Sequence, residues 1–126
     1  MFLQLAHTKL NVYHSSKSLA LECYKLTARF PADEKFAMVQ QIRRAALSVN
    51  LNLAEGCSRK SKVERNRFFE IARGSVIEID TAFEIANDLL YTTSEQLKPL
   101  GNLIVSTFRL LSGMLTSGNS PLTTHH

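Results

Sequence analysis

The sequence predicts an all-α protein, an antiparallel up-down-up-down four-helix bundle formed by a single domain over residues 1–126. Three observations predict this class. The chain has only five glycines and three prolines, which is few for a fold with many turns. Apolar residues recur at steps of three and four, the spacing of a buried helix face. The stretches between these patterns are short, which favours antiparallel neighbouring helices.

The first two helices are expected over residues 9–30 and 33–56. The first ends before Pro31, because a proline disfavours helical backbone in the residue before it. We expect Gly56 to end the second helix as a left-handed cap. The core faces of the two helices are predicted to comprise Val12, Leu19, Cys23, Leu26 and Phe30, and Phe36, Val39, Ile42, Ala46, Val49 and Leu53.

The third and fourth helices are expected over residues 62–91 and 94–116. Ser61 and Glu64 have the spacing of a capping box at the start of the third helix. Its predicted seam is Phe69, Ala72, Val76, Ile79, Phe83, Ala86 and Leu90, widened by Phe68, Ile71, Ala82, Ile85 and Leu89. We expect Gly74, a costly residue inside a helix, to permit close approach of a neighbouring helix. We expect the Thr-Thr-Ser run before residue 95 to cap the fourth helix.

The cysteines and the apolar stretches of the chain indicate the compartment in which the protein is expected. Cys23 and Cys57 have neither a disulfide framework nor metal-ligand spacing, so we expect reduced thiols and a cytoplasmic protein. The N-terminus does not resemble a secretory signal, and no window approaches the roughly 18 apolar residues of a membrane span. We expect no membrane association and assign no role to His125 and His126.

The positive charge of the chain is concentrated in one stretch. Residues 59–73 contain six basic and two acidic side chains and therefore carry the whole formal charge of +4. Two interpretations stay open: a surface that contacts phosphates, or the solvated exterior of a turn. Because Phe68 and Phe69 are adjacent, at least one belongs to the core, and we expect no stacking platform for bases. The predicted nucleic-acid contacts are Arg59, Lys60, Lys62, Arg65, Arg67 and Arg73.

Arg43 and Arg44 lie in the middle of the second predicted helix. We expect at least one of them to pair with an acid on a neighbouring helix or protomer, since a buried guanidinium needs a partner. Glu55 and Glu78 are the candidate acids, and Glu78 falls beside the apolar seam. The alternative is that Arg43 and Arg44 extend the basic surface.

No catalytic motif is evident, so we expect a protein that is not an enzyme and needs no cofactor. The chain contains no nucleophile elbow, phosphate-binding loop or zinc-protease motif. Di-metal bundles combine carboxylates with Glu-x-x-His, but no histidine lies near the acids of the third helix. We interpret those acids as a solvated helix face: Glu78, Asp80, Glu84 and Asp88.

Two ordered motifs resemble a bacterial four-helix-bundle family associated with intervening sequences in 23S rRNA genes, some of whose members are labelled ribosomal proteins. The stretch "QIRRAALSVNLNLAEG" contributes a match that includes Gln41, Arg43, Arg44, Glu55 and Gly56. The stretch "RKSKVERNRFFEIARGSVIEIDTAFEIANDLLY" contributes a second match that includes Arg59, Ser61, Lys62, Arg67, Gly74 and Glu78. "FPADEKF" is similar to a turn of the same family, so the resemblance spans roughly residues 10–91.

The resemblance implies an antiparallel bundle that forms a homo-oligomer, with a pentamer expected. It also implies kinship with the accessory protein of diversity-generating retroelements, which binds nucleic acid and a reverse transcriptase. The function expected from residues and resemblance together is non-enzymatic binding of RNA or DNA by a self-associating bundle. The alternative is a protein-interaction scaffold whose basic rim docks an acidic protein such as a polymerase.

Overall fold

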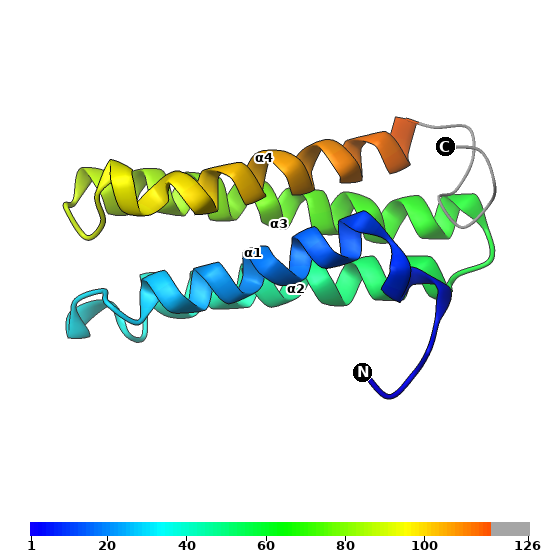
Figure 1. The fold of residues 1–126 in the computed structure, drawn as a ribbon, viewed down its shortest axis with the longest axis horizontal. Helices are drawn as coiled ribbons and strands as arrows, with labels where there is room; N and C mark the ends of the chain where they lie inside the picture. Colours follow the sequence, from blue (N-terminus) through cyan, green and yellow to red (C-terminus); the bar gives the residue numbers. More distant parts are fainter. Residues whose placement is uncertain (117–126) are drawn as a thin grey trace.

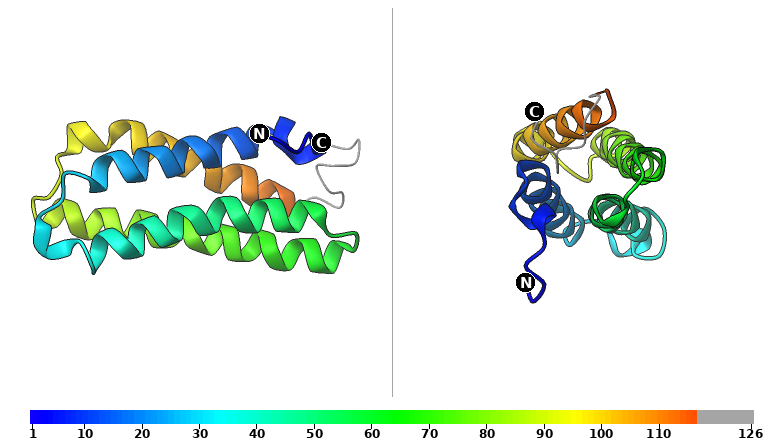
Figure 2. Two further views of the ribbon diagram at one scale, coloured as in Figure 1. Left: turned by 90° about the horizontal axis from the view of Figure 1, so that it is seen from below. Right: turned by 90° about the vertical axis from the view of Figure 1, so that its right-hand side faces the viewer.

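The computed structural model describes residues 1–116 and shows four long helices: α1 (Asn11–Thr27), α2 (Met38–Ser58), α3 (Lys62–Asp88) and α4 (Ser94–Thr116). Two short 3₁₀ helices, η1 (Ala6–Lys9) and η2 (Ala32–Glu34), precede α1 and α2. The helices lie side by side, and each runs opposite to the one before it (Figure 1). Seen from one end, they occupy the corners of a four-helix bundle (Figure 2). The all-α prediction is confirmed.

The core is one apolar cluster to which all four helices contribute, including Leu19, Ile42, Phe69 and Leu100. Two pairs of polar side chains link neighbouring helices inside the bundle. Ser16 of α1 donates to Asn50 of α2 at 3.1 Å, and Ser75 of α3 donates to Ser48 of α2 at 2.8 Å. These pairs satisfy polar groups whose burial without a partner would destabilise the fold. Among residues 1–116, no helix has the length and apolar composition of a membrane span.

The connection between α1 and α2 is longer than predicted. The first helix ends at Thr27 instead of residue 30, and the second begins at Met38 instead of residue 33. The intervening chain forms η2, in which Glu34 accepts hydrogen bonds from the Met38 amide at 3.4 Å and the Tyr91 hydroxyl at 2.7 Å. Phe36 is therefore outside the helix and 82% exposed, so its assignment to the core is wrong.

The third helix ends three residues before its predicted boundary, in a Schellman motif. The amide of Tyr91 donates to the carbonyl oxygen of Ala86, and the amide of Leu90 donates to the carbonyl oxygen of Asn87. Leu90 has a left-handed φ of 67° and is 87% exposed, so the buried seam ends at Ala86. The predicted second stripe is also partly wrong, because Ile71, Ile85 and Leu89 are exposed.

The predicted N-terminal caps of α3 and α4 are present. The Ser61 hydroxyl accepts a hydrogen bond from the Glu64 amide at 3.1 Å. Thr93 and Gln96 form a reciprocal capping box: the Gln96 amide donates to the Thr93 hydroxyl at 3.2 Å, and the Thr93 amide donates to the Gln96 side chain at 3.1 Å. These caps fix where each helix starts after its turn. The α2–α3 turn thereby consists of only three residues, 59–61.

Candidate nucleic-acid interface

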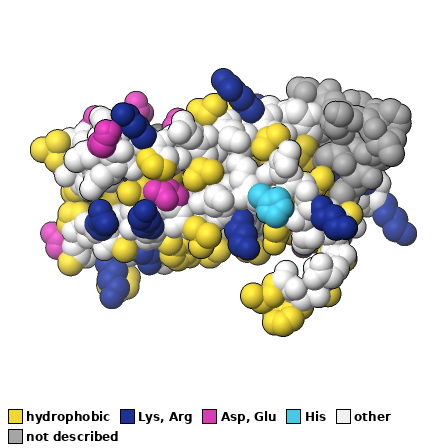
Figure 3. All heavy atoms as spheres, viewed as in Figure 1, with side chains coloured by type: hydrophobic (Ala, Val, Ile, Leu, Met, Phe, Trp, Pro, Cys, Tyr) yellow, Lys and Arg dark blue, Asp and Glu magenta, His cyan; other side chains and the backbone are white. Residues whose placement is uncertain are grey.

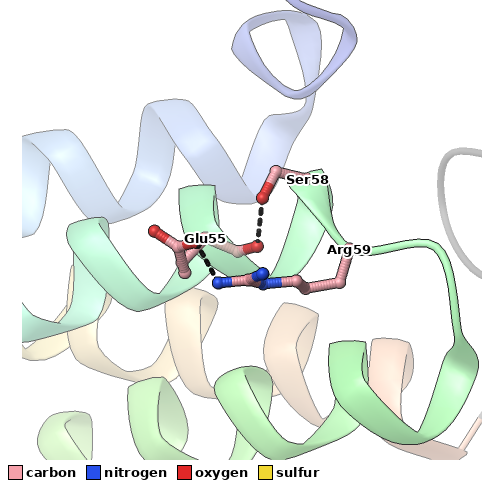
Figure 4. Close-up of polar contacts among 3 residues, drawn as sticks. All are labelled: Glu55, Ser58 and Arg59. Atoms are coloured by element: carbon pink, nitrogen blue, oxygen red, sulfur yellow. Dashed lines mark hydrogen bonds and ion pairs between the residues drawn. The ribbon is translucent and has the colours of Figure 1, made fainter.

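Arg59, at the C-terminal cap of α2, is held against the bundle by two neighbours. Its guanidinium forms an ion pair of 2.6 Å with Glu55, one turn earlier (Figure 4). The same guanidinium lies 5.1 Å from the ring centroid of Phe68. Both charged side chains remain partly exposed, so the pair contributes only about 0.3–0.5 kcal/mol. Arg59 is therefore oriented at the turn, and its charge is partly compensated.

Arg65 closes the turn from the first part of α3. Its guanidinium donates to the carbonyl oxygens of Arg59 at 2.8 Å and Lys60 at 2.9 Å. Both carbonyls lie at or beyond the end of α2, where helical partners run out. The side chain is half-buried, so Arg65 stabilises the shape of the turn, which the sequence did not indicate.

Lys60, Lys62 and Arg67 project from the same corner and are exposed. Among the ion pairs and hydrogen bonds of residues 1–116, none involves the side chains of these three residues. Arg67 has one described neighbour, the Phe68 ring, with 5.7 Å between the guanidinium carbon and the ring centroid. These three cations are therefore available to an external anion.

Arg73 lies further along α3 and packs across the bundle. Its guanidinium carbon is 5.0 Å from the ring centroid of Phe108 on α4, and the side chain is half-buried. Arg73 therefore lies at the flank of the basic corner, and a cation–π contact fixes its position.

Neither Arg43 nor Arg44 forms an ion pair among residues 1–116, so the expected partner on a neighbouring helix is absent there, and pairing with an acid of another protomer stays a prediction. Arg43 donates to the Thr27 hydroxyl at 2.9 Å and the Tyr24 carbonyl at 3.3 Å, and stacks 4.6 Å from the Tyr24 ring centroid. Arg44 is exposed and forms none of the described ion pairs. The two proposed acids also behave differently, since Glu55 pairs with Arg59 and Glu78 is exposed on α3.

Neither Gly56 nor Gly74 has the role that the sequence predicted for it. Gly56 lies inside α2 without a left-handed φ, so it is not a helix cap. A Cβ atom there would lie 2.6 Å from the Phe69 ring, so Gly56 permits the close approach of α2 and α3. Gly74 has open space where a Cβ would lie, so the expectation that a helix of the same chain packs against it is wrong.

Charge is distributed unequally between the two ends of the bundle. When each helix is divided at its midpoint, the half with the α2–α3 turn comprises residues 1–19, 48–75 and 105–116. This half contains nine basic and three acidic side chains, a net charge of +6. The other half contains six basic and eight acidic side chains, a net charge of −2. On the face in Figure 3, most of the acidic side chains lie toward the negative end.

The two thiols are buried and chemically protected. Burial raises the pKa of Cys23 to about 12 and that of Cys57 to about 11, from an ordinary value of 9.0. Among residues 1–116, no three His, Cys, Asp or Glu side chains lie together in a way that suits a metal ion. His125 and His126 lie outside the described residues.

Sequence reasoning missed one feature of the positive end, the N-terminal arm, residues 1–5. Its side chains Met1, Phe2 and Leu3 are 92%, 89% and 69% exposed. The arm stands away from the bundle at the end that contains the α2–α3 turn (Figure 1). The available signal was an uncharged, largely apolar run at the start of a basic protein.

The fold and this corner define a small four-helix-bundle protein with its positive charge at one end. The family model of the 23S rRNA-intervening sequence protein matches residues 8–113, and the chain belongs to that family. A solved structure of a protein of unknown function, from the S23 ribosomal protein family of Bacteroides thetaiotaomicron, has a similar fold. It matches with a TM-score of 0.75 and 23% identity, over 84% of this chain and 99% of that chain. No curated protein sequence matches the chain.

Proposed function

We propose that this protein is a non-enzymatic, self-associating bundle that binds RNA or DNA through the phosphates of the nucleic acid. The observation that carries the proposal is the net charge of +6 on the half of the bundle that contains the α2–α3 turn. A focused positive surface attracts polyanions and concentrates them before contact. The family name is consistent with a link to rRNA, but the binding itself is our proposal.

The direct phosphate contacts are assigned to Lys60, Lys62 and Arg67, because these exposed cations form none of the described ion pairs. Arg59 joins them when a phosphate displaces the Glu55 carboxylate, an exchange that costs little at an exposed pair. Arg65 holds the backbone of the turn in place. Arg73 is assigned to the flank of the corner. Arg43 and Arg44 lie in the other half of the bundle and extend the basic surface along α2, where Arg44 is exposed and Arg43 is half-buried.

Self-association is proposed because several apolar side chains of α3 face outward. Ile71, Ile77 and Ile85 are 46%, 50% and 47% exposed, and Gly74 leaves an opening among them. Burial of apolar area contributes about 25 cal/mol per Å², so a second copy is a favourable partner for this face. An assembly of copies, with a pentamer expected from the family resemblance, would multiply weak phosphate contacts by avidity.

The test is a comparison of two variants that remove equal charge from opposite ends. Lys60→Gln, Lys62→Gln and Arg67→Gln together neutralise the proposed contacts. Lys25→Gln, Arg29→Gln and Lys35→Gln together neutralise exposed cations at the other end. Fluorescence anisotropy with labelled RNA and DNA should show a large loss of affinity for the first variant and a small loss for the second. Equal losses, or none, would exclude a specific basic corner.

The alternative is a scaffold that docks an acidic protein, and the apolar groove between α3 and α4 favours it. This groove has a volume of about 300 Å³ and is lined by residues that include Ile77, Val105, Phe108 and Arg109. In that case the pure protein binds nucleic acid poorly, and affinity capture recovers a defined protein partner. Neighbouring genes for an rRNA insertion or a reverse transcriptase would indicate which process the protein serves.

A further inference from the structure

The N-terminal arm leaves large apolar side chains in water beside the basic corner. Phe2 is 89% exposed and Leu3 is 69% exposed. The space-filling view shows the arm as an apolar projection separated from the body of the bundle (Figure 3). Exposed apolar side chains that lie together mark a site of interaction with a partner or ligand.

A hollow of about 630 Å³ separates the arm from the outer face of α2. This volume lies in the range of about 300–1,000 Å³ that is usual for small-ligand sites. On one side lie the rings of Phe2, His7 and Tyr13, and His7 and Tyr13 meet edge to face with centroids 5.3 Å apart. On the other side lie Leu51, Ala54, Glu55 and Ser58. One oxygen of the Glu55 carboxylate is paired with Arg59, and the Ser58 hydroxyl donates to the Glu55 carbonyl oxygen at 2.7 Å, so this wall offers hydrogen-bond acceptors (Figure 4).

These two walls have the chemistry that recognises a nucleobase. Aromatic rings stack on the face of a base, and a carboxylate or hydroxyl pairs with the polar groups at its edge. Glu55 forms its ion pair with Arg59, so the hollow borders the α2–α3 turn directly. A nucleotide with its base in the hollow would have its phosphate beside the cations of that turn.

We infer that the hollow between the N-terminal arm and α2 receives an unpaired base, and that the protein prefers single-stranded to duplex nucleic acid. This inference rests on the proposed function. It is favoured over an apolar peptide because a peptide needs neither the aromatic walls nor the surrounding positive charge. A duplex keeps its bases stacked and offers only phosphates to this corner, so the hollow adds affinity for a single strand alone.

Phe2→Ala tests the inference, and Phe36→Ala is the matched control. Phe36 is also a largely exposed phenylalanine, with 82% of its surface accessible, and it lies near the opposite end of the bundle. The probes are a labelled mixed-sequence single strand and the duplex of the same sequence. Phe2→Ala should weaken single-strand binding by at least about fivefold, the lower limit for loss of one stacked base. Duplex binding, and both affinities of Phe36→Ala, should remain unchanged.

The possible outcomes separate this inference from the proposed function. If the unaltered protein binds neither probe, both proposals fail. If it binds both probes and Phe2→Ala binds them as tightly, only the role of the hollow is refuted. Sedimentation of Phe2→Ala supplies the remaining control: an altered assembly would mean that the arm contacts a second copy, which would overturn the inference.

Discussion

Replacement of Gly56 by alanine tests the packing that fixes the basic corner. The added Cβ would lie 2.6 Å and 2.9 Å from two atoms of the Phe69 ring and 3.1 Å from the Phe68 Cβ. Phe69 is only 1% exposed, so its ring has no free space into which to move. Overpacking of this kind costs about 1–3 kcal/mol, whereas alanine in place of glycine inside a helix gains about 1 kcal/mol.

Gly74→Ala is the control that isolates the steric contribution. Position 74 is inside α3 and has no atom of the same chain within 4 Å of the added Cβ. Within one chain, Gly74→Ala therefore has only the higher helix propensity of alanine, worth about 1 kcal/mol. Gly56→Ala should therefore be less stable than Gly74→Ala by about 1–3 kcal/mol. Urea denaturation followed by circular dichroism, at equal protein concentration, measures the difference. Equal stability of the two variants would refute the close approach of α2 and α3 at Gly56.

Two further predictions concern the end of α3 and the buried thiols. Leu90→Gly should stabilise the protein by up to about 1 kcal/mol, because glycine adopts the left-handed conformation without strain; a lower melting temperature would contradict the Schellman motif. Stability should fall as the pH rises above 9, since the unfolded thiols ionise near 9.0 while the native pKa values are about 12 for Cys23 and about 11 for Cys57. The stabilisation from the two buried thiols is fully present below pH 9. Cys57→Ala should therefore make the free energy of unfolding less dependent on pH between about 9 and 11. An unchanged pH dependence would contradict the burial of this thiol.

Much of the fold was predictable because helix signals are local. The steps of three and four in α3 predicted the buried residues from Phe69 to Ala86, and Ser61 predicted the start of that helix. The errors fall where two local signals compete. Phe36 fitted the periodicity of α2, but η2 and the Glu34 hydrogen bonds carry the chain away from the core before the helix begins.

The positions of the basic residues were predictable, but their availability was not. The sequence places six cations in residues 59–73, but only the folded turn shows that Arg65 binds backbone carbonyls and Arg59 binds Glu55. Arg43 or Arg44 was expected to pair with an acid, but Arg43 instead donates to the Thr27 hydroxyl and stacks on the Tyr24 ring. These contacts join residues that are far apart in the chain or in separate helices, so spacing alone does not reveal them.

The salt dependence of nucleic-acid binding tests the account of the basic corner most directly. Three exposed cations per protomer should give a log–log slope of about −2 or steeper for a single strand. Neutralisation of Lys60, Lys62 and Arg67 should make that slope shallower by about 2, whereas neutralisation of Lys25, Arg29 and Lys35 should leave it steep. Binding that is independent of salt, or a slope that is unchanged after loss of the corner cations, would contradict the account.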